Sequence, residues 1–271
     1  MKKTFSSKKS AFSLIELSIV LIIIGLLIAG ITGGASLIKS SELRSIMGEA
    51  RGYAVAVNSF FTQYDQYPGD ASINVGQSSI TQATGDRDNK IEFVNDNTTS
   101  PVAEGIDAWF DLKDIGAIDL ALTALVHTTD TTGSLHVPGS LVPVTDIPGS
   151  KIKGAGWVFD YNISTLQNVV VLTGTTSAYV APAAGATSTM VNGLNYSSDA
   201  SATRNGSTEI ISAPDSLSID SKIDDGKPAS GNVQSINQAT ATTECSTATA
   251  YIVSNGAKKV CVLTFRVDVS S

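Results

Sequence analysis

The stretch that decides the fold is residues 8–38, KKSAFSLIELSIVLIIIGLLIAGITGGASLI. From Leu17 to Ile38 it holds 22 residues without a charge. As an α-helix this run would be about 33 Å long, enough to cross a hydrocarbon core of about 30 Å. Glu16 stands just inside the start of the apolar run, where an ionised carboxylate costs about 2–3 kcal/mol. We therefore expect a membrane-spanning helix in which Glu16 has a function.

A short basic leader precedes the apolar run, with lysines at positions 2, 3, 8 and 9, followed by Ala11 and Phe12. With Glu16 four residues after Phe12, this pattern resembles the leader of type IV pilins and type II secretion pseudopilins. The resemblance implies cleavage between Ala11 and Phe12 by a prepilin peptidase and N-methylation of Phe12. It also implies that Glu16 pairs with the freed amine of Phe12 on a neighbouring subunit during assembly. Gly25 matches a glycine that many members carry inside the membrane segment.

The sequence departs from the usual family pattern at two places. Ala11 stands where most members have glycine, and Gly33-Gly34 stands where many members have a proline that loosens the helix. Adjacent glycines lower helix propensity by about 1 kcal/mol each, so the pair would create a similar weak point by different chemistry.

Two other interpretations of the amino terminus stay open at this point. A Sec signal peptide also combines basic residues with an apolar run, and Gly33-Gly34-Ala35 resembles its cleavage site. A plain single-pass anchor would keep Met1. Against the signal peptide, the uncharged run exceeds the usual apolar core of about 7–15 residues. Neither alternative has a use for Glu16.

The helix is expected to continue beyond the membrane as an amphipathic one, because apolar residues recur at steps of three and four. They are Leu43, Ile46, Met47, Ala50, Tyr53, Ala54, Val57, Phe60, Phe61 and Tyr64. The helix should run from Phe12 to about Gln66 and end near Tyr67-Pro68-Gly69, where proline and glycine favour a turn. The expected organisation is a leader (1–11), a transmembrane and assembly half (12–38), an amphipathic half (39–67) and a globular domain (68–271).

The globular domain is expected to be an antiparallel sheet of about four strands packed on this helix, which makes the fold class α+β and pilin-like. Residues 156–163 and 166–174 predict a β-hairpin, and 259–269 alternates as a strand. One face would carry Cys261, Leu263, Phe265 and Val267, and the other Val262, Thr264, Arg266 and Asp268. A short amphipathic helix is expected around Trp109 and Phe110, with this aromatic pair in the core. Residues 174–208, rich in Ala, Ser, Thr and Gly, predict a long surface excursion.

The two cysteines, Cys245 and Cys261, are expected to form a disulfide, because the chain is predicted to be exported to an oxidising compartment. Closing this loop would stabilise the fold by about 3 kcal/mol. Many type IV pilins have such a carboxy-terminal disulfide loop, so the resemblance supports the pairing. Two free buried thiols are the alternative.

Two acidic segments are candidate Ca²⁺ sites, because carboxylate and amide oxygens are its usual ligands. The weaker one holds Asp86, Asp88, Asn89 and Glu92, where a solvated turn is the favoured interpretation. The stronger one is Asp220, Asp224 and Asp225, at the end of a helix that Ser212 and Pro214 should begin and Gly226 should end. The helix dipole disfavours negative charge there, so either nearby lysines (Lys222, Lys227) or bound Ca²⁺ should offset it. Type II secretion major pseudopilins have a carboxy-terminal calcium site, so the resemblance supports this candidate.

Composition argues against catalysis and nucleic-acid binding. The formal charge of −7 becomes −11 upon loss of the four leader lysines, which opposes non-specific binding to nucleic acid. The only histidines, His127 and His136, lack metal-ligand spacing, and the sequence has no phosphate-binding glycine loop. We expect a protein that is not an enzyme.

The resemblance implies a structural subunit of a type IV pilus or of a type II secretion pseudopilus. Its partners would be copies of itself, other pilin-like subunits, prepilin peptidase and the inner-membrane assembly platform. It would wait as a single-pass protein of the inner membrane and then enter a periplasmic or cell-surface filament. The alternative is a minor subunit whose soluble domain binds a surface, DNA or a secreted substrate, for which the 174–208 excursion would be suited.

Overall fold

The protein is an α+β protein that divides into two compact units, Met1–Glu42 and Leu43–Ser271. The computed structural model describes residues 13–71, 85, 87–92, 104–119, 128–129, 135–136, 140–141, 143–144, 147–162, 165–174, 176–177, 210–236 and 245–268. Several residues of the sequence predictions lie outside this set: Ala11, Phe12, Asp86, His127 and most of 174–208.

Helix α1 (Leu14–Tyr64) confirms the predicted long helix and contributes to both units. It runs through Gly33 and Gly34 without a break, so the expected weak point does not interrupt the helix. It ends where predicted: Asp65 has a φ of 54° and Gly69 a φ of 83°. A Cβ at Gly69 would collide with the backbone carbonyl of Glu104, so only glycine fits this turn.

The amino-terminal part of α1 is apolar on all sides and is not covered by its own chain. Large side chains from Leu14 to Ile38 are exposed, Leu14 at 86% and Leu37 at 73%. Among the described residues, α1 is the one helix long and apolar enough to cross a membrane, and its most apolar window has no buried residue. A core helix of a soluble protein would be mostly buried, so this surface needs lipid or other apolar helices.

Within the second unit, α1 supplies one wall of the core. All ten predicted apolar positions are buried or pack against the core as partly buried side chains. Tyr53 lies at the centre, with its ring 4.9 Å from that of Trp109 and 5.7 Å from that of Trp157, both at edge-to-face angles. Burial and the nearby charge of Glu49 raise the pKa of Tyr53 above its usual value. The helical stripe therefore marks the core correctly.

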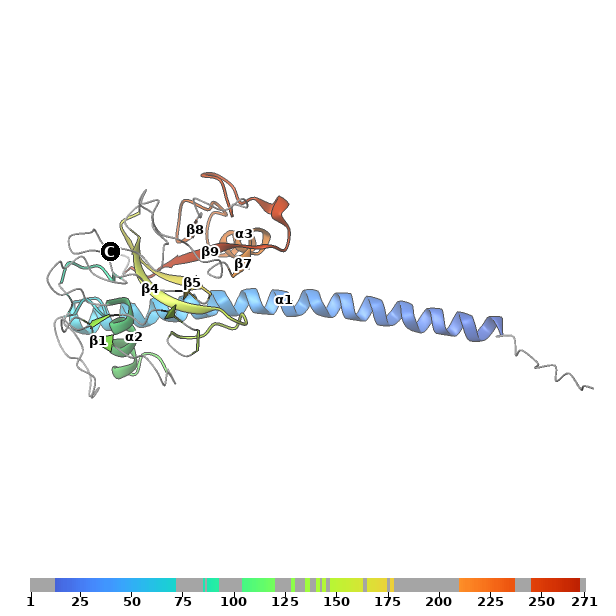
Figure 1. The fold of residues 1–271 in the computed structure, drawn as a ribbon, viewed down its shortest axis with the longest axis horizontal. Helices are drawn as coiled ribbons and strands as arrows, with labels where there is room; N and C mark the ends of the chain where they lie inside the picture. Colours follow the sequence, from blue (N-terminus) through green and yellow to red (C-terminus); the bar gives the residue numbers. More distant parts are fainter. Residues whose placement is uncertain are drawn as a thin grey trace, which may run out of the picture. The chain divides into compact units, whose positions relative to one another are not determined.

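Helix α2 (Glu104–Asp114) is the predicted short amphipathic helix. Trp109 and Phe110 are both buried, and Trp109 lies 4.2 Å from the ring of Phe159 in the sheet, which confirms that this pair belongs to the core. In Figure 1, α2 is drawn beside the carboxy-terminal end of α1.

The main sheet has five antiparallel strands, where the sequence predicted about four. Strands β4 (Gly156–Asn162) and β5 (Gln167–Thr173) form the predicted hairpin, in register from Gly156–Thr173 to Asn162–Gln167. The carboxy-terminal strand β9 (Lys259–Arg266) pairs with β5, with β7 (Ile211–Ser212) and with β8 (Val233–Ile236). Figure 1 shows β9 running between these partners.

Strand β9 is buried on both faces along most of its length. Every residue from Val260 to Phe265 is buried, which includes members of both alternating sets. Helix α3 (Ala213–Ile223) contacts β9, β7 and β8.

The remaining described elements are short. Strands β1 (Thr128–Thr129) and β2 (Leu135–His136) pair with each other, as do β3 (Ser140–Leu141) and β6 (Thr176–Ser177). A 3₁₀ turn, η2 (Val253–Asn255), precedes β9. The predicted disulfide is present: Cys245 and Cys261 are joined with an S–S distance of 2.02 Å.

Glu49 of α1 ties the helix to the segment that leads into β4. Its Oε2 accepts hydrogen bonds from Trp157 Nε1 at 2.8 Å and Ser150 Oγ at 2.7 Å, and its Oε1 accepts one from the backbone N–H of Lys151 at 3.1 Å. Trp157 is completely buried, so its indole N–H depends on this acceptor.

We predict that Glu49→Ala lowers the free energy of unfolding by about 1–3 kcal/mol, because a buried indole N–H loses its acceptor. Urea unfolding of the full chain in detergent measures this loss. Glu49→Gln keeps an acceptor of the same shape and should lose clearly less. Arg51→Ala, an exposed change on the same helix, is the control and should be neutral. An equal loss in Glu49→Gln and Glu49→Ala would contradict the role given to this acceptor.

Candidate functional site

The carboxylate of Glu16 closes the amino end of α1. Ser13 directly precedes the helix, and its backbone N–H donates to Glu16 Oε2 at 2.9 Å. The first N–H groups of a helix lack partners within the helix and carry a partial positive charge, so a carboxylate in the first turn is favoured there. This contact is one half of a capping box. The helix geometry therefore reduces the cost of Glu16 that the sequence alone suggested.

Glu16 is also the one charged residue in a surface of exposed apolar side chains. Its neighbours Ile15 and Leu17 are 66% and 59% exposed, and the exposed run continues through Ile38. A partner helix approaching this surface would meet one carboxylate, able to pair with a positive charge, among aliphatic side chains. Because Phe12 lies outside the described residues, the structure does not place its amine relative to Glu16.

The segment around Asp88 forms a turn built on Asp70, a residue that the sequence reasoning missed. The carboxylate of Asp70 accepts the backbone N–H groups of Arg87 at 2.6 Å and Asn89 at 2.9 Å. Asp88 instead forms an ion pair with Lys90. These contacts are those of the turn favoured from the sequence, and the Ca²⁺ hypothesis for this segment has no further support in the described residues.

Glu92, the last candidate of that segment, lies in the core with 2% of its surface exposed. Its backbone N–H donates to the carboxylate of Glu104, and its carbonyl accepts from Gly105 at the start of α2. Glu92 therefore connects this turn to α2 through its backbone, and no sequence pattern links the two segments.

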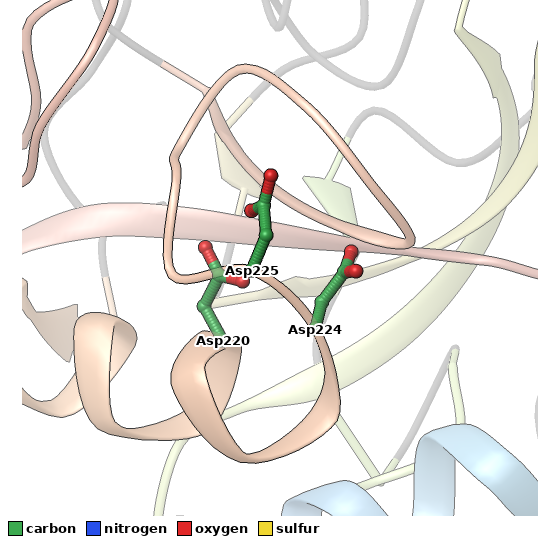
Figure 2. A group of neighbouring side chains, drawn as sticks. All are labelled: Asp220, Asp224 and Asp225. Carbon is green, nitrogen blue, oxygen red and sulfur yellow. The ribbon is translucent and has the colours of Figure 1, made fainter.

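The second acidic group is assembled at the end of α3, as predicted. Ser212 is the N-cap residue, and its side chain accepts the N–H of Asp215. Pro214 lies in the first turn, and Asp224 is the C-cap residue. Asp220, Asp224 and Asp225 each present a carboxylate oxygen, and these three atoms lie within 4.8 Å of one another (Figure 2).

Asp220 is the buried member of this group, with 0% of its surface exposed. Its Oδ1 accepts the backbone N–H of Gly226 at 3.1 Å, and its Oδ2 accepts the hydroxyl of Tyr251 at 2.8 Å. The pKa of this carboxyl is raised to about 6, and burial is the main cause. The charges of Asp225 and Asp224 also raise this pKa, while the two hydrogen bonds oppose the shift. Tyr251, 31 positions further along the chain, has no sequence signal that connects it to Asp220.

Asp224 and Asp225 are more exposed and are bound by donors of their own turn. Asp224 Oδ2 accepts the backbone N–H groups of Asn232 and Val233. Asp225 accepts the N–H of Lys227 and the hydroxyl of Ser230, both at 2.8 Å. The ammonium of Lys227 lies 3.9 Å from Asp225, a surface ion pair worth little. Much of the repulsion that the sequence analysis identified is therefore offset by hydrogen bonds.

The three carboxylates fit a hard cation such as Ca²⁺ in donor type and in spacing. Asp220, Asp224 and Asp225 are the residues that would hold it, and the cation would neutralise charge at the end of α3. The hydrogen bonds of the turn already do part of this work, so the Ca²⁺ site stays a prediction.

We predict that Asp220 makes the stability of the protein depend on pH. Its pKa of about 6 in the folded protein lies above the ordinary value of 3.8, so between pH 4 and pH 6 the folded state holds a proton that the unfolded chain has released. Stability from this group therefore falls as pH rises through that window. From pH 4.5 to pH 7, urea unfolding should show a larger fall in the free energy of unfolding for wild type than for Asp220→Asn. The exposed change Asp119→Asn is the control, and a constant difference between wild type and Asp220→Asn would contradict the assignment.

The Ca²⁺ hypothesis predicts that millimolar Ca²⁺ raises the thermal midpoint of the wild-type protein and that a chelator reverses the rise. A cation at 100 times its dissociation constant would add about 2.7 kcal/mol. The double variant Asp224→Asn/Asp225→Asn should lose the response, while Asp88→Asn should keep it. A midpoint that neither Ca²⁺ nor chelator moves would remove the hypothesis.

Comparison with known proteins adds to the amino-terminal site. The family model of the prokaryotic N-terminal methylation motif matches residues 6–32, which include Ala11, Phe12 and Glu16. Comparison with curated proteins and with solved structures found no match. The chain therefore carries the leader signature of type IV pilins and pseudopilins at the head of a helix long and apolar enough to cross a membrane.

Proposed function

We propose that this protein is a structural subunit of a type IV pilus or of a type II secretion pseudopilus. In this proposal prepilin peptidase cleaves between Ala11 and Phe12, and Phe12 is then N-methylated. The subunit waits in the inner membrane until the assembly platform adds it to a periplasmic or cell-surface filament. The observation that carries the proposal is the methylation motif over 6–32, joined to a helix whose apolar surface is exposed on all sides.

The exposed half of α1 supports assembly through this helix. In the membrane its side chains contact lipid, and in a filament they would contact the same helices of neighbouring subunits. Both environments are apolar, so the exchange has little hydrophobic cost. A subunit can therefore leave the bilayer without exposing this surface to water.

Glu16 supports a defined register within such a filament. The N–H of Ser13 holds Oε2, which fixes the carboxylate in the first turn, while Oε1 retains lone pairs for a second donor. Cleavage creates that donor, the positive amine of Phe12, on every subunit. A buried charge that is left unpaired is costly, and one that is paired specifies a single alignment of the helices.

A role without catalysis is part of the proposal. The sequence holds two histidines and no phosphate-binding or nucleophile motif. The features that the structure describes best, a long helix, a covalently closed carboxy-terminal loop and a packed sheet, are those of a building block.

We predict that Glu16→Ala reduces the amount of this protein in sheared filaments by at least about tenfold, the factor that corresponds to 1.4 kcal/mol. Glu16→Gln separates the two roles of the side chain, because its amide oxygen can still accept from Ser13 while the charge is lost. If the charge pairs with a neighbouring amine, Glu16→Gln should fail to assemble as Glu16→Ala does. Glu42→Gln, further along the same helix, is the control.

Mass spectrometry of the mature amino terminus accompanies this test. The proposal requires that the mature wild-type chain begins with methylated Phe12. Both Glu16 variants should also begin at Phe12, with or without the methyl group. Filaments of normal amount in Glu16→Gln would show that capping, not charge pairing, is the role of Glu16. A mature chain beginning near Ser36 or at Met1 would overturn the prepilin interpretation itself.

A further inference from the structure

A small hairpin closed by Cys245 and Ile252 lies next to α3. The backbone N–H of Ile252 donates to the carbonyl of Cys245 at 2.8 Å, and Ser246 pairs with Tyr251 across the hairpin. Tyr251 is therefore tied through the backbone to the segment that begins at Cys245.

The disulfide joins this hairpin to the middle of the sheet. Cys245 is bonded to Cys261, a completely buried residue of β9. Next to it, the hydroxyl of Ser246 lies 2.8 Å from that of Ser235 in β8. The covalent bond is the strongest of these links, because a neutral hydrogen bond contributes only about 0.5–1.5 kcal/mol.

Tyr251 connects the hairpin to the acidic turn. Its hydroxyl donates to Asp220 Oδ2 at 2.8 Å, with 6% of Tyr251 and 0% of Asp220 exposed. The other oxygen of Asp220 holds the N–H of Gly226, the residue at which the chain turns away from α3 with a φ of 73°. A buried carboxylate that loses a hydroxyl donor pays the cost of desolvation, so the conformation that buries it becomes less stable.

We propose that the disulfide Cys245–Cys261 is a redox-sensitive support of the acidic turn 224–232, acting through the hydrogen bond from Tyr251 to Asp220. Reduction by a dithiol transfers two electrons and two protons to the two sulfur atoms, which become thiols, while the dithiol becomes a disulfide. The hairpin then loses its covalent anchor, Tyr251 separates from Asp220, and the turn that Asp220 holds through Gly226 opens.

Through this coupling, the cellular compartment of the protein would decide whether the turn is closed. Disulfides form in oxidising compartments and are kept reduced in the cytosol. The closed turn, with Asp224 and Asp225 on its surface, would then form only in molecules whose globular domain has been exported and oxidised. A partner that contacts this turn would bind oxidised subunits alone.

Amide hydrogen exchange on the full chain in detergent tests the proposal, with a chelator present so that no cation holds the turn. Reduction should accelerate exchange at least about tenfold at Gly226, Asn232 and Val233, whose N–H groups are bound by Asp220 and Asp224. Val170 and Leu172, in the paired strand β5, report the loss of global stability upon reduction, and the acceleration at the three turn amides should exceed theirs.

Tyr251→Phe separates the hydrogen bond from the covalent bond. This variant keeps the disulfide, and it should show the accelerated exchange at Gly226 while oxidised, with little further change upon reduction. Thr249→Ala, an exposed change in the same hairpin, is the control and should behave as wild type.

Three results would overturn the proposal. Equal exchange at Gly226 in oxidised and reduced wild type would show that the disulfide does not support the turn. An acceleration in β5 as large as that at Gly226 would show general destabilisation in place of a local effect. A Tyr251→Phe variant that exchanges as wild type in both redox states would show that the coupling does not pass through Tyr251.

Discussion

The structure depends on one constraint, the apolar surface of the first half of α1 that its own chain leaves uncovered. A helix with aliphatic side chains on all sides is stable in lipid or among similar helices and is unstable in water. This constraint explains why the half of the helix from Leu14 to Ile38 contains a single charge, and why that charge stands in the first turn. In the first turn, the N–H of Ser13 and the helix dipole make a carboxylate least costly.

The second half of the same helix follows a different rule, because it packs against the sheet of its own chain. There one stripe is buried and the other is polar, and the stripe is centred on Tyr53 and its two tryptophan neighbours. Glu49 adds a polar link to the same region, since it accepts from the indole of Trp157. The change from a uniformly apolar to an amphipathic pattern within one helix therefore separates the proposed assembly surface from the folding core.

Sequence patterns predicted the elements whose signals are local. The long helix, the β4–β5 hairpin, the amino-terminal cap of α3 and the disulfide follow from periodicity, turn residues or cysteine count, and the structure confirms each. The helix α3 ends at Ile223 with Asp224 as its C-cap, before the predicted Gly226. The sequence did not reveal the contacts of Asp70 with Arg87, of Glu49 with Trp157 or of Asp220 with Tyr251, because these partners are separated along the chain and no periodicity relates them.

The hydrogen bond between Ser13 and Glu16 has a consequence for the polarity of the proposed filament. It holds the carboxylate toward the amino end of α1, and leader cleavage would place the new amine at that same end. In the proposed filament, this donor and this acceptor therefore both lie at the amino end of each helix. A stack of such helices has a built-in polarity, so the two ends of the filament are chemically different before any other protein acts on them.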